Sequence, residues 1–167
     1  PVFNPGVSLE LAELRKQEVS GLKYKLYFKI PEDKNEEVSG KVVVDFMLNR
    51  TNVDKTNEFG GVLLDCRINK DKIYKVWANG RQVKKWIVNE HIVIPESVVK
   101  KGANQIAVQF VAEDQSLNRN AEYLYTLLVP DRARTLFPCF DQPNLKAEFS
   151  LQLDIPARWT AVSNTAI

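Results

Sequence analysis

Apolar and polar residues alternate along most of this chain. The pattern is clearest in residues 22–30, LKYKLYFKI, and in residues 147–155, AEFSLQLDI. Successive side chains of a β-strand point to opposite faces of its sheet, so a period of two places the apolar residues on a core and the polar residues in water. Both segments are therefore predicted to be strands with one buried face.

Eight further segments carry the same alternation, or a short apolar run bounded by turn residues. Asn79-Gly80 separates two of them and is the strongest hairpin signal in the chain, because a type I′ turn needs positive φ at both central positions. Residues 51–59 and 113–120 are polar and are expected to form loops. The predicted strands span residues 40–49, 61–68, 73–78, 81–88, 91–94, 105–112 and 121–128, and the last begins at Trp159 and runs to the end of the chain.

Only the beginning of the chain predicts a helix of any length. Ser8 is suited to the N-cap, apolar residues follow at helical spacing, and Gly21 is expected to end the helix. Residues 95–101 can make a single further turn. Roughly nine or ten short strands with turn signals every 8–12 residues favour an all-β fold. We expect one domain over residues 1–167, an antiparallel β-sandwich or saddle of packed sheets with one short N-terminal helix.

Charge and hydropathy argue against two kinds of partner. The 167 residues include 23 Lys or Arg and 21 Asp or Glu, so the chain has no basic excess to attract nucleic acid or an anionic membrane. Its apolar runs fall far short of the ~20 residues that span a bilayer, and no segment has the layout of a signal peptide. A soluble chain is expected, and the sequence leaves the cell envelope, periplasm and cytoplasm open. Pro1 in place of Met fits a processed chain or a piece of a longer one.

Residues that could carry out catalysis or bind a metal are few. His91 is the only histidine, and no carboxylate or cysteine stands at a ligand spacing around it, so it is expected to be packed or on the surface. Cys66 and Cys139 are too far apart in sequence to indicate a metal pair, and a disulfide between them is allowed but not implied. The residues therefore predict no catalytic group, no metal site and no cofactor in this chain. The tryptophans are expected in the core or on a sheet face rather than as a platform for sugars: Trp77, Trp86 and Trp159.

The densest local pattern is RTLFPCFDQPNLKAEF, residues 134–149. Pro138 and Pro143 restrict the conformation of the residues before them, and Asp141 is expected to cap the turn that follows it. Cys139 has no base near it in the sequence and is expected to be a small buried residue. From the residues alone, this segment is a rigid corner that joins two strands.

The same segment resembles part of the aminopeptidase N family of zinc metallopeptidases, which includes leukotriene hydrolase. The family pattern R-x-x-F-P-C-x-D-x-P-x-x-K-A-x-F is matched throughout residues 134–149, and the similarity continues through WTAVSN, residues 159–164. Agreement in the same order over nearly the whole chain identifies it as a member of this family. The other matching positions are Leu11-Ala12, Arg15, Tyr24, Leu26, Phe28, Leu64-Asp65, Ile68, Val76, Asn79-Gly80, Gly102, Asn104 and Ile106.

The resemblance implies an N-terminal β-saddle domain that packs against a thermolysin-like catalytic domain of the same polypeptide. In the family, an H-E-x-x-H helix with a second glutamate binds one zinc ion, and a G-x-M-E-N loop binds the amino end of a peptide substrate. None of these motifs is present here, since Met47 is followed by Leu48. The resemblance therefore implies a zinc aminopeptidase as the parent protein, a hydrolase, and no enzymatic activity in residues 1–167 alone.

One residue of this domain also contacts the substrate in many members of the family. A Gln or Glu just before the R-x-x-F-P-C run accepts a hydrogen bond from the free α-amine of the peptide. An ungapped count from Cys139 places Val129 at this position, and valine cannot accept that bond. Either this member has lost the anchor, or the register shifts and Asp131 is the nearest carboxylate. Asp131 also fits an ordinary turn residue, because it follows Pro130.

Two other classes of function stay open from the sequence. Relatives of these peptidases that lost their zinc serve as scaffolds in transcription-initiation complexes, and nothing in residues 1–167 separates such an adaptor from an enzyme. A free-standing β-sandwich binding module would share the architecture alone. The residues that follow in the parent gene discriminate among the three: an intact H-E-x-x-H indicates the enzyme, a degraded one the adaptor, and a stop codon near Ile167 the module.

Overall fold

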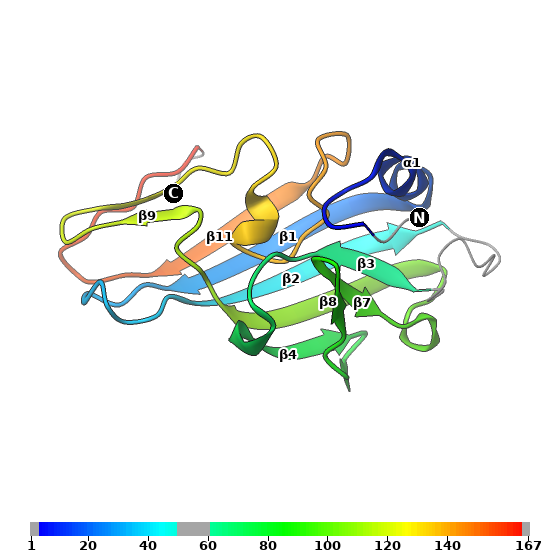
Figure 1. Cartoon of the computed structure of the whole chain (residues 1–167), viewed down its shortest axis with the longest axis horizontal. Coiled ribbons are helices and arrows are strands. Elements are labelled where there is room, and N and C mark those ends of the chain that lie inside the picture. Colours follow the sequence, from blue (N-terminus) through cyan, green and yellow to red (C-terminus); the bar gives the residue numbers. More distant parts are fainter. Residues whose placement is uncertain (1–3, 50–60, 165–167) are drawn as a thin grey trace.

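The computed structural model describes residues 4–49 and 61–164, and within them it confirms an all-β fold with one short N-terminal helix (Figure 1). Three single 3₁₀ turns also occur, at Lys70–Lys72, Glu96–Val98 and Ala133–Thr135. The regular elements of this part of the chain are α1 (Leu9–Glu18), β1 (Val19–Lys29), β2 (Ser39–Leu48), β3 (Val62–Asp65), β4 (Ile73–Ala78), β5 (Arg81–Val83), β6 (Ile87–Val88), β7 (His91–Ile94), β8 (Gly102–Val111), β9 (Leu117–Arg119), β10 (Leu124–Thr126) and β11 (Glu148–Asp154).

Six strands form one large sheet in the order β11-β1-β2-β8-β4-β5. Neighbouring strands are antiparallel except β1 and β11, which run parallel with Lys23 opposite Glu148. In β1 the apolar residues are buried and the lysines are exposed, as the alternation predicts. Because β11 is parallel to β1, the sheet is not purely antiparallel. Strand β11 follows a long connection after β10 and lies at the edge of the sheet beside β1.

The core lies between the large sheet and the segments that cover one of its faces. A three-stranded sheet, β3-β7-β6, and the β9–β10 hairpin lie on this side. In Figure 1, α1 covers one end of the sheet, the hairpin lies near the other end, and the 3₁₀ turn at Ala133–Thr135 stands between them. The largest fully buried side chains come from both layers: Phe110, Ile73 and Ile106 from the large sheet, and Leu64, Ile92 and Ile94 from the small one.

Helix α1 begins where the sequence predicts and ends earlier. The Ser8 side chain accepts a hydrogen bond from the Leu11 N–H at 3.2 Å, which confirms the N-cap. The chain passes directly into β1 at Val19, so Gly21 is not the helix stop that the sequence suggests. Gly21 instead lies inside β1 with φ +59°, where the register with β2 shifts. A positive φ at a bulge is the conformation that glycine adopts without strain.

The Asn79-Gly80 hairpin is confirmed, but the strand expected after it is split. Both turn residues have positive φ, and Val76 pairs with Val83 across the turn. The predicted strand over 81–88 is in fact β5 in the large sheet and β6 in the small one, separated by Lys84–Trp86. A single period-two pattern cannot report that a chain leaves one sheet for another, because both halves alternate in the same way.

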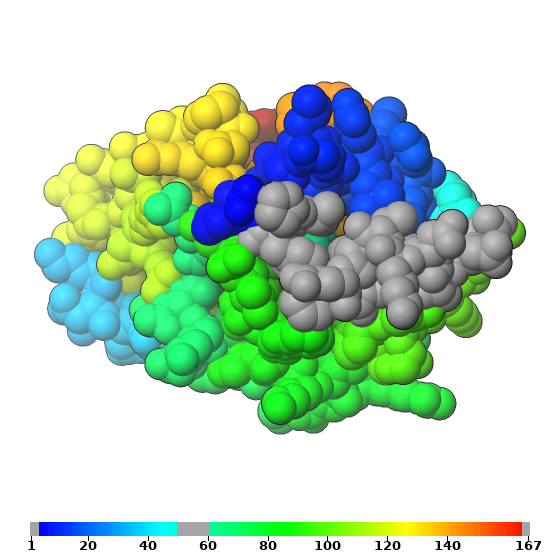
Figure 2. Space-filling model, turned by 45° about the vertical axis from the view of Figure 1, so that its right-hand side comes forward, coloured from blue at the N-terminus to red at the C-terminus, as the bar shows by residue number. Residues whose placement is uncertain are grey.

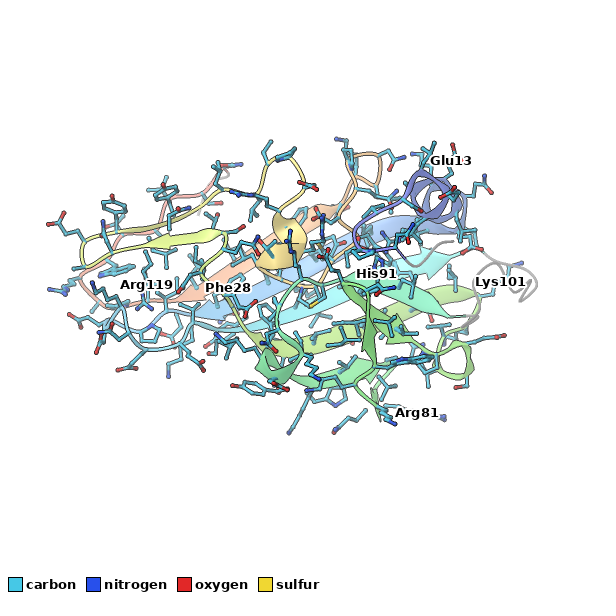
Figure 3. All side chains as sticks on the ribbon, in the orientation of Figure 1. Glu13, Phe28, Arg81, His91, Lys101 and Arg119 are labelled. Carbon is cyan, nitrogen blue, oxygen red and sulfur yellow. The ribbon has the colours of Figure 1, made fainter. Side chains whose placement is uncertain are left out.

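Three further expectations about strands are wrong. Residues 113–120, expected as a loop, contain β9, and the strand expected over 121–128 shortens to β10. Arg119 attaches this β9–β10 hairpin to the turn between β1 and β2. Its guanidinium donates to the carbonyls of Pro31, Asp33 and Glu36 in that turn (Figure 3). The segment from Trp159 to Asn164 forms no strand, because no neighbouring strand pairs with it. The loop expected at 51–59 lies outside the described residues.

Candidate functional site

The corner predicted at residues 134–149 is built around the guanidinium of Arg134. Nη1 donates to the Asp131 carbonyl at 2.8 Å and to Asp141 Oδ2 at 3.2 Å, and Nε lies 3.4 Å from Glu90 Oε2. The Arg134 N–H also donates to Asp141 Oδ2 at 3.1 Å. Asp141 therefore binds back to the preceding turn and does not cap the following one, which corrects the sequence-based expectation. Burial raises the pKa of the Asp141 carboxyl, and the bonds from Arg134 oppose that shift.

Val129 stands at the start of this corner with 76% of its surface exposed. The Val129-Pro130 peptide bond is cis. Every second residue before it is also an exposed large apolar one, so we call Tyr123, Tyr125, Leu127 and Val129 the outer stripe. The rings of Tyr123 and Tyr125 lie 6.1 Å apart between centroids. Of the three residues in between, Leu124 and Leu128 pack against the core, and Thr126 is exposed.

Asp131, the alternative site residue, is engaged within the corner. Its Oδ2 lies 3.3 Å from Arg134 Nη2, and its carbonyl accepts from Nη1 of the same side chain. The Asp131 side chain is still 64% exposed, whereas the Arg134 side chain is 9% exposed. Asp131 thus acts as a turn residue with its charge partly satisfied, and Val129 is the more prominent of the two at the surface.

Beneath the corner lies a buried polar cluster centred on Asp65, the last residue of β3. Its carboxylate accepts from Arg15 Nη1 at 2.8 Å and from Nη2 at 2.7 Å. His91 Nδ1 lies 3.0 Å from Asp65 Oδ1, and the Asp141 N–H donates to Oδ2 at 2.7 Å. Gln142 joins the cluster through Arg15 Nη1 at 3.4 Å. The cluster therefore fastens α1, β3, β7 and the corner to one carboxylate.

The charge of Asp65 is stabilised although the side chain has no exposed surface. Burial alone would raise the pKa of the Asp65 carboxyl, but the Arg15 guanidinium and the hydrogen bond from His91 bring this pKa below its usual range. His91 Nε2 lies 3.3 Å from the Asn4 carbonyl, so the N-terminal segment is tied to the same cluster. Figure 2 shows that segment, in dark blue, next to green parts of the chain.

Sequence reasoning missed this cluster, although its members were visible. The sequence identifies Arg15 and Asp65 only as positions that match the family, and it predicts that His91 is packed or on the surface. His91 is indeed fully buried. The available signal was an aspartate inside the apolar run VLLDC, residues 62–66. A carboxylate in such a run is rarely buried without a cationic partner, so it predicts a partner but not its identity.

The cysteines are structural. Cys66 and Cys139 are both buried and free, so the disulfide that the sequence allowed is not formed. Burial raises the pKa of the Cys66 thiol to about 12, and burial also raises that of Cys139. A metal ligand must be a thiolate, and both thiols are disfavoured in that form. Over residues 4–49 and 61–164 the structure contains no group of His, Cys, Asp and Glu that could hold a metal ion. The residues described here therefore do not fit a zinc site.

An apolar groove of about 520 Å³ opens between the sheet and the β9–β10 hairpin. Its floor comes from β1 and β11, and its rim from the hairpin and residues 159–164. On β11 the apolar face that the alternation predicts to be buried is largely uncovered, with Phe149 61% and Leu151 47% exposed. The expectation of a buried apolar face over residues 147–155 is therefore met only in part: Ala147, Leu153 and Ile155 are half-buried against the core, whereas Phe149 and Leu151 are exposed.

No helix in the described part of the chain has the length and apolar character needed to cross a membrane.

This architecture is that of a mostly antiparallel β-sandwich domain to which an N-terminal helix is clamped. The family model for the Peptidase M1 N-terminal domain matches residues 20–167, and the chain belongs to this family. Among curated proteins, a segment of 44 residues is 50% identical to Aminopeptidase N of Streptomyces lividans. That segment is 26% of this chain and 5% of the relative. The family resemblance drawn from the residues is confirmed.

Solved structures share the fold at low sequence identity. Leukotriene A4 hydrolase from Saccharomyces cerevisiae superposes with a TM-score of 0.61 at 19% identity, over 84% of this chain and 24% of that one. An M1 zinc metallopeptidase from Deinococcus radiodurans gives a TM-score of 0.57 at 17% identity, over 81% of this chain and 32% of that one. The chain thus spans a quarter to a third of the proteins whose fold it shares.

Proposed function

We propose that this chain is the N-terminal domain of a zinc-dependent metallo-aminopeptidase, a hydrolase that removes N-terminal amino acids from peptides. The observation that carries the proposal is the match of the Peptidase M1 N-terminal domain over residues 20–167. Similarity to a protein named Aminopeptidase N and to a structure described as an M1 zinc metallopeptidase supports it. The zinc ion and the groups that activate water belong, in this proposal, to a catalytic domain of the same polypeptide.

The domain itself supplies surface rather than catalytic groups. The described residues do not fit a zinc site, and the buried cluster around Asp65 has all its charges directed at one another. What the surface offers is apolar: the outer stripe and the groove above β11. Exposed apolar patches of this kind mark surfaces that pack against another domain or a ligand. We assign the outer stripe to packing on the catalytic domain and to the wall of the substrate cleft.

Val129 is the residue of this stripe that we assign to the substrate. It precedes the rigid corner and is the most exposed member of the stripe at 76%. An apolar side chain at this place offers contact area to the peptide but no acceptor for its ammonium group. Asp131, whose carboxylate is held by Arg134, is assigned to the corner and not to the substrate.

The experiment uses the full-length protein that contains this chain. We expect one tightly bound zinc per polypeptide and hydrolysis of aminoacyl anilides that a chelator abolishes and added zinc restores. A full-length protein that binds no zinc and hydrolyses none of these substrates contradicts the proposal and indicates the scaffold class. Zinc bound by residues 1–167 alone, at one ion per chain, contradicts the assignment of the metal to another domain.

A further inference from the structure

The face of the large sheet that points away from the core carries an arrangement that the proposed function does not use. Strand register places Tyr27 opposite Lys41, Lys41 opposite Gln109, and Gln109 opposite Lys75. These four side chains form one row across β1, β2, β8 and β4. All four are exposed or half-buried on this face. The sheet thus displays an aromatic ring, two ammonium groups and an amide along a line perpendicular to its strands.

The adjacent row has short side chains in its middle and an aromatic side chain at one end. Val43 pairs with Ala107, and Ala107 pairs with Trp77, which is half-buried on β4. Valine and alanine are short, so the residues between Lys25 at one end and Trp77 at the other leave room above the backbone. We call Tyr27, Lys41, Gln109, Lys75 and Trp77 the platform. The sequence alone favours the core or a sheet face for Trp77 over a platform for sugars. The structure places Trp77 on the sheet face, half-buried, and the proposal below departs from the rest of that expectation.

The lysines of the platform have no counter-charge in the described part of the chain. Two other lysines of this face form ion pairs: Lys23 with Glu148 at 2.8 Å, and Lys25 with Asp45 at 3.3 Å. Lys41 and Lys75 form no such ion pair with a described residue. They are two strand separations apart, about 10 Å. That spacing suits anionic groups repeated along an extended polymer better than one small anion.

We propose that the platform binds an acidic polysaccharide, a chain of sugar rings that carries carboxylates. Tyr27 and Trp77 offer apolar ring faces to the sugars, and the Gln109 amide can both donate to and accept from hydroxyl groups. Lys41 and Lys75 each provide an ammonium for a charge-assisted hydrogen bond to a carboxylate. The platform therefore offers one kind of group for each part of such a ligand: aromatic surface for the sugar rings, an amide for the hydroxyls and ammonium groups for the carboxylates. The site is separate from the outer stripe and does not depend on the peptidase assignment.

Two other polyanions fit this face less well. The strands that carry the platform, β1, β2, β8 and β4, contain no arginine, the side chain that binds phosphate groups in two-pronged fashion. Arg81 on the edge strand β5 pairs with Ala78, which is buried in the core, and not with a platform residue. A lipid surface is engaged by apolar side chains that protrude into it, whereas Tyr27 and Trp77 are half-buried among their neighbours. The observations therefore favour a carboxylated sugar chain over nucleic acid or membrane.

The test measures binding of polygalacturonate to the full-length protein by isothermal titration calorimetry. We expect binding to polygalacturonate, none to neutral dextran, and at least tenfold weaker binding to poly-L-glutamate, which has the carboxylates without the rings. Lys41→Gln/Lys75→Gln and Trp77→Val should each weaken binding tenfold or more. The control is Lys100→Gln/Lys101→Gln, which removes the same charge away from the platform; Figure 3 shows Lys101 at one end of the molecule. It should bind like the unmodified protein.

Circular dichroism and melting temperature verify that each variant is folded. If Trp77→Val unfolds, the comparison of Lys41→Gln/Lys75→Gln with Lys100→Gln/Lys101→Gln still decides the proposal, because these lysines are exposed at the surface. The proposal is overturned by absence of binding to polygalacturonate, or by equal losses in the platform and control lysine variants. Equal binding to poly-L-glutamate also overturns it, since charge alone would then suffice. Tighter binding to duplex DNA or to phosphatidylserine vesicles assigns the face to that other class of partner and overturns it as well.

Discussion

Arg15 on α1 and Asp65 at the end of β3 form a two-pronged ion pair with N–O distances of 2.8 and 2.7 Å, although 50 residues separate them in the chain. Arg15 is 4% exposed and Asp65 is not exposed at all. Two charges taken out of water cost more than one ion pair returns unless further hydrogen bonds satisfy them. Here His91 and the Asp141 N–H supply those bonds, so the pair depends on β7 and on the corner.

Removing the charge of Asp65 should destabilise the fold strongly. Asp65→Asn keeps the shape of the side chain but leaves the Arg15 guanidinium buried without a counter-charge, which costs about 3–5 kcal/mol of unfolding free energy. Urea unfolding at pH 7 measures the loss. The control is Asp45→Asn, which breaks the surface pair with Lys25 and should cost at most about 1 kcal/mol. Similar losses in the two variants would show that the cluster is no more important than a surface pair.

The loss of stability in Asp65→Asn should depend on pH. The pKa of Asp65 is lower in the folded chain than its ordinary value of 3.8, so the ionised group stabilises the fold above that value. This stability is lost as the pH falls through the folded pKa. The difference in unfolding free energy between the parent and Asp65→Asn should therefore be constant from pH 7 to about pH 5 and shrink below about pH 4. A difference that grows on acidification would contradict the assignment.

The two thiols should be inert while the chain is folded. Cys66 has a pKa of about 12, and burial raises that of Cys139 as well, so almost no thiolate is present at pH 8. Ellman's reagent should react with neither cysteine in the native protein and with both after unfolding. Rapid reaction of one thiol under native conditions would show that the corner opens. Fewer than two reactive thiols after unfolding without reductant would indicate a disulfide.

Two glycines should respond differently to the addition of one methyl group. A Cβ at Gly61 would stand 1.8 Å from the Ile94 carbonyl oxygen, so β3 and β7 would have to separate. Gly61→Ala is expected to cost about 3 kcal/mol or more, at the upper end for overpacking. Gly80 has φ +79° and open space around it, so Gly80→Ala carries only the conformational cost of about 1 kcal/mol. Thermal unfolding compares the two, and a larger loss at Gly80 would contradict the close approach at Gly61.

Val129→Glu tests the cleft assignment in the full-length protein. A glutamate facing the ammonium of a peptide in a partly desolvated cleft adds a charge-assisted hydrogen bond of roughly 1.5–3 kcal/mol. The ratio of kcat/KM for free over N-acetylated peptides should therefore rise about tenfold or more. Leu127→Glu, with the same charge two residues earlier in the outer stripe, is the matched control and should change the ratio less. An unchanged ratio in Val129→Glu, with a reduced ratio in Asp131→Asn, would assign the site to Asp131.

The strands of the large sheet could be predicted from the sequence because the alternation of apolar and polar residues is a local pattern. Residues 22–30 alternate, and β1 has the predicted buried and exposed faces. The Asn79-Gly80 turn was equally predictable, since its positive φ values are a property of those two residues. Ser8 capped α1 as expected for the same reason. In each case the chemistry of a few consecutive residues decides the backbone conformation.

The corner and its surroundings were predicted only in part. The two prolines of 134–149 and a capping Asp141 predict a rigid corner. Asp141 does stabilise this corner, but by binding back to Arg134 and not by capping the turn that follows. The parallel return of β11 along β1 was not visible, because alternation is the same for parallel and antiparallel partners. Val129 and Asp131 stay a prediction, since surface exposure does not by itself identify a substrate contact.

Local periodicity determined by itself where most strands lie and which side chains share a face, because the geometry of the extended backbone enforces a period of two. The tertiary structure alone decided which face is covered. Phe149 and Leu151 alternate as regularly as Tyr24 and Leu26, yet the first pair is exposed and the second buried. It also decided that Asp65 would meet Arg15 and His91, because burial and ion pairing are set by neighbours that are distant in the chain and brought together only when the sheets pack.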